Sequence, residues 1–126
     1  MKVEHYEDIP AQKVDMPGSQ DCQIRVLVSD RDGAPTFAMR QFEVAVGGFT
    51  PRHFHDYEHE VFVLAGEGTV SHGDTQHPLK TGDVIFVAPN EVHQFQNTGS
   101  APLKFLCLIP NSAAGKPITV APNEGC

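Results

Sequence analysis

The sequence has little that would bring the protein to a membrane or to nucleic acid. Its 126 residues include no tryptophan, and no apolar run approaches the roughly 18 residues of a membrane span. Lysine and arginine number 9 against 16 aspartates and glutamates, which gives a formal net charge of −7. This negative excess disfavours nucleic acid and anionic membrane surfaces as partners. The first residues lack the apolar segment of a signal peptide, so we expect a cytoplasmic protein.

Cysteine is scarce as well. Cys22, Cys107 and Cys126 are an odd number with no close pair. Their spacing excludes a disulfide framework and a CxxC zinc site. We therefore expect three free thiols in a reducing compartment, with Cys126 exposed.

Helical periodicity is missing, whereas turn residues are frequent. The chain contains 11 glycines and 10 prolines, and its turn signals recur about every eight to twelve residues, a spacing typical of all-β sandwiches and barrels. We expect Gly47-Gly48 and Pro51 to interrupt the second strand. The expected strand regions are 22–29, 36–46, 58–72 as two strands, 83–88, 93–97 and 103–110.

The length predicts a single domain over residues 1–126. Residues 111–126 follow the last long strand and read as a C-terminal extension. We expect this extension to contain one helical turn at 112–115 at most, and either to be loosely ordered or to add one edge strand at 118–120.

Histidine is the residue that the sequence concentrates. His53, His55 and His59 fall within seven positions, and His93 follows after further predicted strands. Residues two apart on a strand share a face, so His53 and His55 point the same way. His59 can join them if the chain turns at 56–57. Clustered imidazoles of this kind indicate a first-row transition-metal site.

The remaining histidines have different surroundings. His5, His72 and His77 lie in polar or turn-rich segments. We expect these three to be surface residues rather than metal ligands.

The first histidine group resembles the first sequence motif of the cupin superfamily. That motif is glycine, five residues, His-x-His, three or four residues, glutamate, six residues and glycine. Here the pattern is Gly47, five residues, His53-Phe54-His55, three residues, His59, six residues and Gly66. Histidine thus stands where the motif has glutamate.

The region around His93 resembles the second cupin motif, which is glycine, five residues, Pro-x-Gly, two residues, histidine, three residues and asparagine. Here Gly82 is followed by Ala88-Pro89-Asn90, by His93 and by Asn97. Proline is displaced by one position, and asparagine replaces the motif's glycine. Because asparagine tolerates left-handed backbone better than most residues, we expect the turn to survive.

The resemblance implies an antiparallel jelly-roll β-barrel, also called a double-stranded β-helix, with its motif core at 47–97. It is closest to small four-histidine cupins, which bind one divalent transition-metal ion. The ligands would be His53, His55, His59 and His93, and the ion Mn, Fe, Cu, Ni or Zn. Glu60 would replace His59 only if the strand slipped by one residue, which would reverse every side chain on it.

Strand alternation extends these expectations beyond the ligands. If His59 faces inward, so do Val61 and Val63, while Phe62 and Leu64 face outward. Apolar residues on both faces indicate that the outer face is covered, either by another strand or by a second subunit, and of these we expect a homodimer.

A substrate pocket can be predicted in the same way. Lys104 should face water, so Phe105 and Cys107 on the same strand should face the interior and form an apolar wall. Arg40 lies in an apolar strand and can pair with a carboxylate of a small anionic ligand. The predicted pocket residues are therefore Arg40, Phe105 and Cys107.

Four imidazoles on an octahedral ion leave two positions for other ligands. This favours a metal-dependent oxidoreductase, such as a dioxygenase, that acts on a small organic molecule. One alternative is a non-redox isomerase, decarboxylase or cyclase that uses the ion as a Lewis acid. Another is a module that binds a small ligand without turnover. The sequence does not identify the substrate, because cupins of one fold carry many chemistries.

Overall fold

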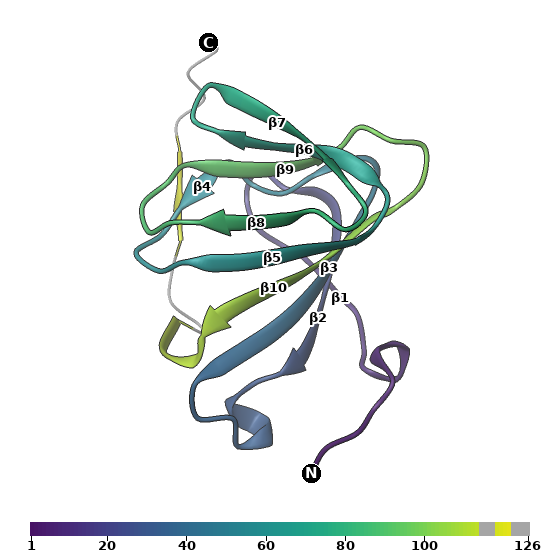
Figure 1. Cartoon of the computed structure of the whole chain (residues 1–126), viewed down its shortest axis with the longest axis vertical. Helices are drawn as coiled ribbons and strands as arrows, with labels where there is room; N and C mark the ends of the chain where they lie inside the picture. The colour runs from purple at the N-terminus through teal and green to yellow at the C-terminus, as the bar shows by residue number, and fades with distance from the viewer. Residues whose placement is uncertain (114–117, 122–126) are drawn as a thin grey trace.

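The computed structural model describes residues 1–113 and 118–121, and these residues form an all-β barrel (Figure 1). They contain short 3₁₀ turns but no α-helix. The strands are β1 (Gln12–Lys13), β2 (Gln20–Val28), β3 (Phe37–Phe49), β4 (His53–Phe54), β5 (His59–Ala65), β6 (Glu67–His72), β7 (Thr75–Lys80), β8 (Val84–Val87), β9 (His93–Asn97), β10 (Leu103–Pro110) and β11 (Thr119–Val120). The 3₁₀ turns are η1 (Tyr6–Asp8), η2 (Asp30–Asp32) and η3 (Asn111–Ala113).

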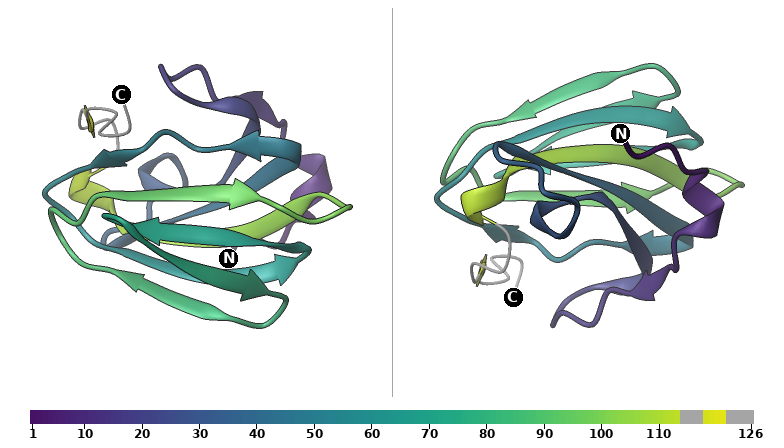
Figure 2. Two further views of the ribbon diagram at one scale, coloured as in Figure 1. Left: turned by 90° about the horizontal axis from the view of Figure 1, so that it is seen from above. Right: turned by 90° about the horizontal axis from the view of Figure 1, so that it is seen from below.

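All strands belong to one antiparallel sheet that curls on itself. Its main order is β11-β4-β9-β3-β10-β5-β8, and β1 and β2 continue from β3. The β6–β7 hairpin attaches through β9. Viewed along the barrel, the strands surround a common interior (Figure 2). The antiparallel jelly-roll barrel predicted from the resemblance is confirmed.

The curl is incomplete on one side. In the described part of the chain, β8 pairs with β5 alone and β7 pairs with β6 alone. Between the described residues of these two edges there is no backbone pairing. This open side lies next to β9, which carries His93.

The interior follows strict alternation along the central strands. On β5, Val61 and Val63 are buried while Phe62 and Leu64 are exposed, as predicted. On β10, Phe105 is buried and its ring stacks on two other phenylalanines. The centroid distances are 5.3 Å to Phe42 and 4.6 Å to Phe95. Fully burying such a side chain contributes about 1.5–3 kcal/mol.

The prediction that Gly47-Gly48 would interrupt the strand was wrong, because β3 continues to Phe49. Gly47 adopts a φ of 80°, and the register with β2 shifts between Gln20 and Cys22. A Cβ on Gly48 would lie 2.7 Å from the Gln20 carbonyl oxygen. The glycines therefore bend the strand and let the two backbones approach closely, as in a β-bulge.

Strand β7 was not predicted, and Pro78 sits inside it. Proline lacks the N–H that a central strand needs, but it is tolerated at a sheet edge. Since β7 pairs with β6 alone in the described part of the chain, Pro78 occupies such an edge.

The C-terminal edge strand is confirmed as β11, which pairs with β4 through Thr119–Phe54 and Val120–His53. The expected turn is η3, which ends at Ala113. The rest of the predicted turn and Cys126 lie outside the described residues. Within the described ranges, no helix has the length and apolar character needed to cross a membrane.

Candidate metal centre

The two motifs meet where the short strand β4 pairs with β9. Pro51 follows the long strand β3, and two residues later His53 begins β4. His53 lies directly opposite His93 in the antiparallel register. His59 begins β5 after the turn at 56–57 and points to the same interior. The sheet therefore brings four histidines from three strands and one turn into a single cluster.

The cluster has the dimensions of a metal site. One nitrogen from each of His53, His55, His59 and His93 lies within 4.8 Å of the others. All four side chains are buried. The Nε2 atoms of His55 and His59 are 2.5 Å apart. The alternative ligand Glu60 points outward and is exposed, so the slipped register is not observed.

Three of the histidines are oriented by backbone carbonyls. The Nδ1–H of His53 donates to the Pro51 oxygen at 2.6 Å. The corresponding donors of His55 and His93 reach the Tyr57 and Glu91 oxygens at 2.7 and 2.8 Å. A proton fixed on Nδ1 leaves Nε2 with a free lone pair, which is the arrangement that metal-binding histidines adopt.

His59 is held differently. Its Nδ1 lies 2.6 Å from the Cys107 sulfur. Nη2 of Arg40 donates to the same sulfur at 3.2 Å and lies 3.5 Å from Nδ1 of His59. The outer edge of this imidazole therefore contacts two side chains instead of a carbonyl.

Burial keeps the four imidazoles neutral. It lowers the pKa of His55 to about 4 and that of His93 to about 3. The pKa values of His53 and His59 are also lowered, first by burial and then by other effects that include the Arg40 charge. Neutral imidazole is the form that binds a metal ion. The site is therefore ready to accept a cation at neutral pH.

The geometry of His55 and His59 also fits a cation. When both rings carry their proton on Nδ1, two lone pairs face each other across 2.5 Å. Such lone pairs repel each other unless one positive ion binds both of them. The donor set of four neutral imidazoles suits zinc, copper, iron and nickel, and manganese less well.

Two features beyond the ligands support the cluster. The Tyr57 ring stacks on His55 with centroids 3.9 Å apart; its packing role was not predicted, since the sequence marked it only as a turn residue. Asn90 adopts the expected left-handed backbone with a φ of 68°. Its N–H donates to the His55 carbonyl oxygen at 2.7 Å, which ties the second motif to the first.

The predicted pocket residues divide into two groups. Arg40 and Cys107 lie beside His59, on the ring edge opposite Nε2. Phe105 lies in the core, where it stacks on Phe95, and Phe95 in turn meets His93 edge-on. A direct contact of these residues with substrate stays a prediction.

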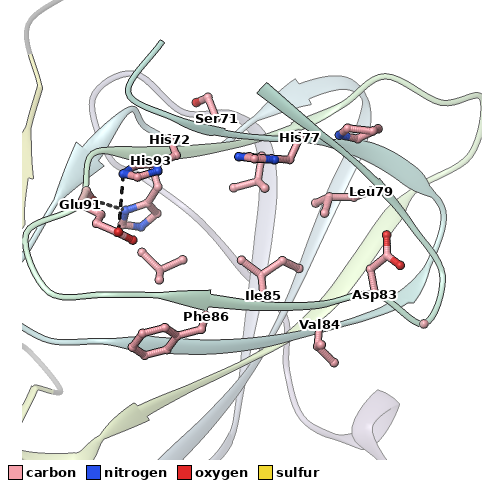
Figure 3. Close-up of a pocket in the computed structure, with 14 residues that line it drawn as sticks. Ser71, His72, His77, Leu79, Asp83, Val84, Ile85, Phe86, Glu91 and His93 are labelled. Atoms are coloured by element: carbon pink, nitrogen blue, oxygen red, sulfur yellow. Dashed lines mark hydrogen bonds and ion pairs between the residues drawn. The ribbon is translucent and has the colours of Figure 1, made fainter. Parts of the chain in front are cut away.

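A cavity of about 590 Å³ occupies the open side of the barrel and includes His93 in its wall. Figure 3 shows the side chains of Leu79 and Ile85 facing each other across it. Its polar wall is formed by Ser71, His72, His77, Asp83, Glu91 and His93. A volume of 300–1,000 Å³ is roughly the range of small-molecule sites.

Sequence reasoning placed His72 and His77 at the surface, and both are exposed as expected. They nevertheless line the cavity, because the β6–β7 hairpin forms one of its walls. Nε2 of His72 lies 3.5 Å from a carboxylate oxygen of Glu91. No spacing rule marks this pair, because β6 and the turn after β8 become neighbours only in the folded sheet.

Comparison with known proteins agrees with the fold and the site. The family model described as "Cupin domain" matches residues 40–109, which include all four histidines and more than half of the chain. The chain belongs to the cupin family. Its clustered histidines make it a metal-binding cupin, as predicted.

Among solved structures, this cupin is similar to the polyketide cyclase RemF from Streptomyces resistomycificus. The TM-score is 0.90 and the identity 32%, over 98% of this chain and 87% of that one. Among curated proteins, it is 40% identical over 58 residues to an oxalate-binding protein of Thermotoga maritima, covering 45% of this chain and 48% of the relative. It is 29% identical over 100 residues to protein SchB of Streptomyces halstedii, covering 78% and 69%. The chain thus spans about half the length of the first curated relatives that it matches.

Proposed function

We propose that this cupin is a metal-dependent, non-redox enzyme that closes a ring in a small molecule rich in carbonyl groups. The observation that carries the proposal is the likeness to a polyketide cyclase over 98% of the chain. The cavity that reaches His93 supports it, because its volume suits a small organic ligand. The cyclase was one of the alternatives that the sequence left open.

The cavity favours an uncharged ligand that has both apolar and polar groups. Val70, Leu79 and Ile85 supply apolar contacts. Among the described residues, the charged side chains in its wall are the carboxylates of Asp83 and Glu91, with no lysine or arginine beside them. An anion would meet unfavourable charge along this route. We therefore replace the small anionic ligand expected from the sequence by a neutral one.

An aldol-type ring closure joins a CH₂ carbon to a carbonyl carbon. A base takes one proton from the CH₂ carbon as the new C–C bond forms, and the carbonyl oxygen takes up a proton and becomes a hydroxyl group. When the hydroxyl group and a second proton of the same CH₂ carbon then leave together as water, a C=C double bond forms. A divalent ion held by the four imidazoles would polarise the carbonyl group. The chain's own contribution is to hold the substrate between β7 and β8 and to accept the proton. His72 is the proposed acceptor, because Glu91 at 3.5 Å stabilises the imidazolium that forms.

The test is to incubate metal-loaded protein with an aromatic poly-β-ketone and to follow the products by mass spectrometry, with and without oxygen. We expect a product with the mass of the substrate, or of the substrate less water, in both atmospheres. His72→Gln should slow its formation, while His77→Gln, in the same cavity wall, should change it little. Saturable binding without any product would contradict catalysis and support a binding module.

The oxidoreductase expected from the sequence is the second candidate. It is favoured by the donor set, because neutral imidazoles also suit iron and copper. In the same experiment, a product that contains added oxygen and forms only in air would support this candidate and contradict the cyclase.

A further inference from the structure

His59 is the ligand whose orientation depends on other side chains. His53, His55 and His93 donate their Nδ1 protons to backbone carbonyls. No ordinary substitution removes those acceptors. Nδ1 of His59 instead meets the Cys107 sulfur at 2.6 Å. The orientation of this one imidazole therefore depends on side chains that lie elsewhere in the sequence.

The sheet register places the sulfur where it can act on His59. Cys107 on β10 lies directly opposite Arg40 on β3 and opposite Val61 on β5. His59 is two residues before Val61 and shares its inward face. Direct neighbours across an antiparallel pair have Cβ atoms about 5 Å apart, and diagonal ones about 7–8 Å, within reach of long side chains. Strand β10 thus holds the sulfur between the arginine and the histidine.

Arg40 fixes the sulfur in turn. Its Nη2 donates to Cys107 at 3.2 Å, and its guanidinium packs over the Phe42 ring at 5.1 Å. Because a guanidinium carries donors and no acceptor, it can orient the sulfur only as a hydrogen-bond acceptor. The second lone pair of that sulfur is then available to the Nδ1–H of His59.

The same contacts argue against a direct role in substrate binding. Cys107 is 2% exposed. Neither Cys107 nor Arg40 lines the cavity that reaches His93. Both touch the Nδ1 edge of His59, whereas a ligand of the ion would approach from the Nε2 side.

We propose that Cys107 and Arg40 are positioning residues of the metal centre. The Cys107 sulfur accepts the Nδ1–H of His59 and turns Nε2 toward the ion, and Arg40 holds the sulfur in place. The sulfur is thus the hydrogen-bond acceptor for Nδ1–H of His59, as backbone carbonyl oxygens are for the other three ligands. This inference rests on metal binding by the four histidines, and not on any particular reaction.

The test measures metal binding to the whole protein with Zn²⁺ and Co²⁺, without substrate. Affinity is obtained by calorimetry, and the visible spectrum of bound Co²⁺ reports the geometry of its ligands. We expect Cys107→Ala to weaken binding by about 10- to 100-fold, the usual effect of removing an outer hydrogen-bond partner. It should also alter the Co²⁺ spectrum. Cys107→Ser retains an acceptor and should recover most of the affinity.

The matched control is Cys22→Ala. Cys22 is equally buried at 1%, but its sulfur contacts the backbone oxygens of Gln20 and Phe49. We expect wild-type affinity and spectrum from this variant. Arg40→Met should change the Co²⁺ spectrum in the same direction as Cys107→Ala, since the sulfur then loses its anchor.

The inference is overturned if Cys107→Ala binds both ions as tightly as wild type with an unchanged spectrum. Should Cys107→Ala not fold, as judged by urea unfolding of the metal-free protein, the decision passes to Cys107→Ser and Arg40→Met. Because Cys107→Ser is expected to resemble the wild type, a wild-type Co²⁺ spectrum from Arg40→Met would then overturn it. If the wild type itself binds neither ion, the metal site fails as a whole, which is a distinguishable result.

Discussion

Tyr57 stacks its ring on the imidazole of His55, with the planes inclined by 7° and the centroids 3.9 Å apart. The same residue accepts the Nδ1–H of His55 through its backbone oxygen. One residue thus fixes both the direction and the tilt of a ligand. The two contacts can be separated by mutation, because only the stacking depends on the side chain.

We predict that Tyr57→Ala weakens Zn²⁺ binding by several-fold, while Tyr57→Phe binds like the wild type. Alanine keeps the backbone acceptor but removes a stacked ring pair, a contact of about 0.5–1.5 kcal/mol. Calorimetric titration of the metal-free proteins gives the affinities. Equal affinity in the alanine variant would show that the carbonyl alone orients His55.

The role of His59 can be tested by restoring the residue of the general motif. We predict that His59→Ala loses most of the metal found in the purified protein, whereas His59→Glu retains an ion because a carboxylate is also a ligand. Metal content is measured by elemental analysis of untagged protein. His77→Ala serves as control, since His77 lies outside the four-histidine cluster. Full metal content in His59→Ala would remove His59 from the ligand set.

The metal-free protein should lose stability as the pH falls. The pKa values of His55 and His93 are near 4 and near 3 in the folded chain, against 6.5 in the unfolded chain. Between these values the unfolded state binds more protons, so unfolding becomes easier as the pH drops below about 6.5. Above that pH the contribution is fully present.

Urea unfolding of the metal-free protein between pH 7 and pH 4 measures this effect. His93→Asn should show a shallower decline than the wild type. His5→Asn changes an exposed histidine and should follow the wild type. Parallel declines in all three proteins would contradict the assignment.

The left-handed backbone conformation in the second motif has a defined cost in folding free energy. Asn90 has a φ of 68°, a conformation that costs most L-residues about 1–2 kcal/mol. We predict that Asn90→Ala lowers the free energy of unfolding by about 1 kcal/mol, while Asn90→Gly leaves it nearly unchanged. The N–H bond to His55 is available in both variants. The midpoints of urea unfolding compare the two variants. An equal loss of stability in both would mean that the Asn side chain matters more than the backbone conformation.

The homodimer expected from the sequence stays a prediction. Phe62 on β5 lies opposite Val84 on β8, and Phe86 is 63% exposed nearby on the same strand. We propose that a second copy covers this outer face, and that Phe86→Glu converts a dimer into a monomer. Light scattering after size exclusion gives the mass. Val3→Glu, at an exposed position near the N-terminus, is the control. A monomeric wild-type protein would contradict the proposal.

The sequence predicted much of the barrel, because alternation and turn residues are local signals. The inward faces of β5 and β10 follow from alternation along the strand, whereas the set of four histidines was implied by the resemblance to the two cupin motifs. Two local features were not interpreted correctly: Gly47 and Gly48 bend a strand that they were expected to interrupt, and the edge strand that contains Pro78 was not predicted. Whether a glycine bends or ends a strand depends on the partner strand, which the sequence does not reveal.

The parts of the site that were missed depend on contacts between distant segments. His72 and Glu91 approach each other because β6 pairs with β9. Arg40 and Cys107 were predicted as interior residues, but only the register between β3 and β10 places both at the outer edge of His59. The alternation of side chains along a strand tells which face a residue lies on. It does not tell which residues of the neighbouring strands it contacts there.

The pairing of His53 with His93 has a consequence for the kinetics of folding. These ligands are far apart in the sequence, so their contact forms only after long loops have closed, which is a slow step in β-proteins. An ion therefore finds its complete set of ligands late, when most of the sheet exists. Bound metal should then act mainly by slowing unfolding, with little effect on the folding rate.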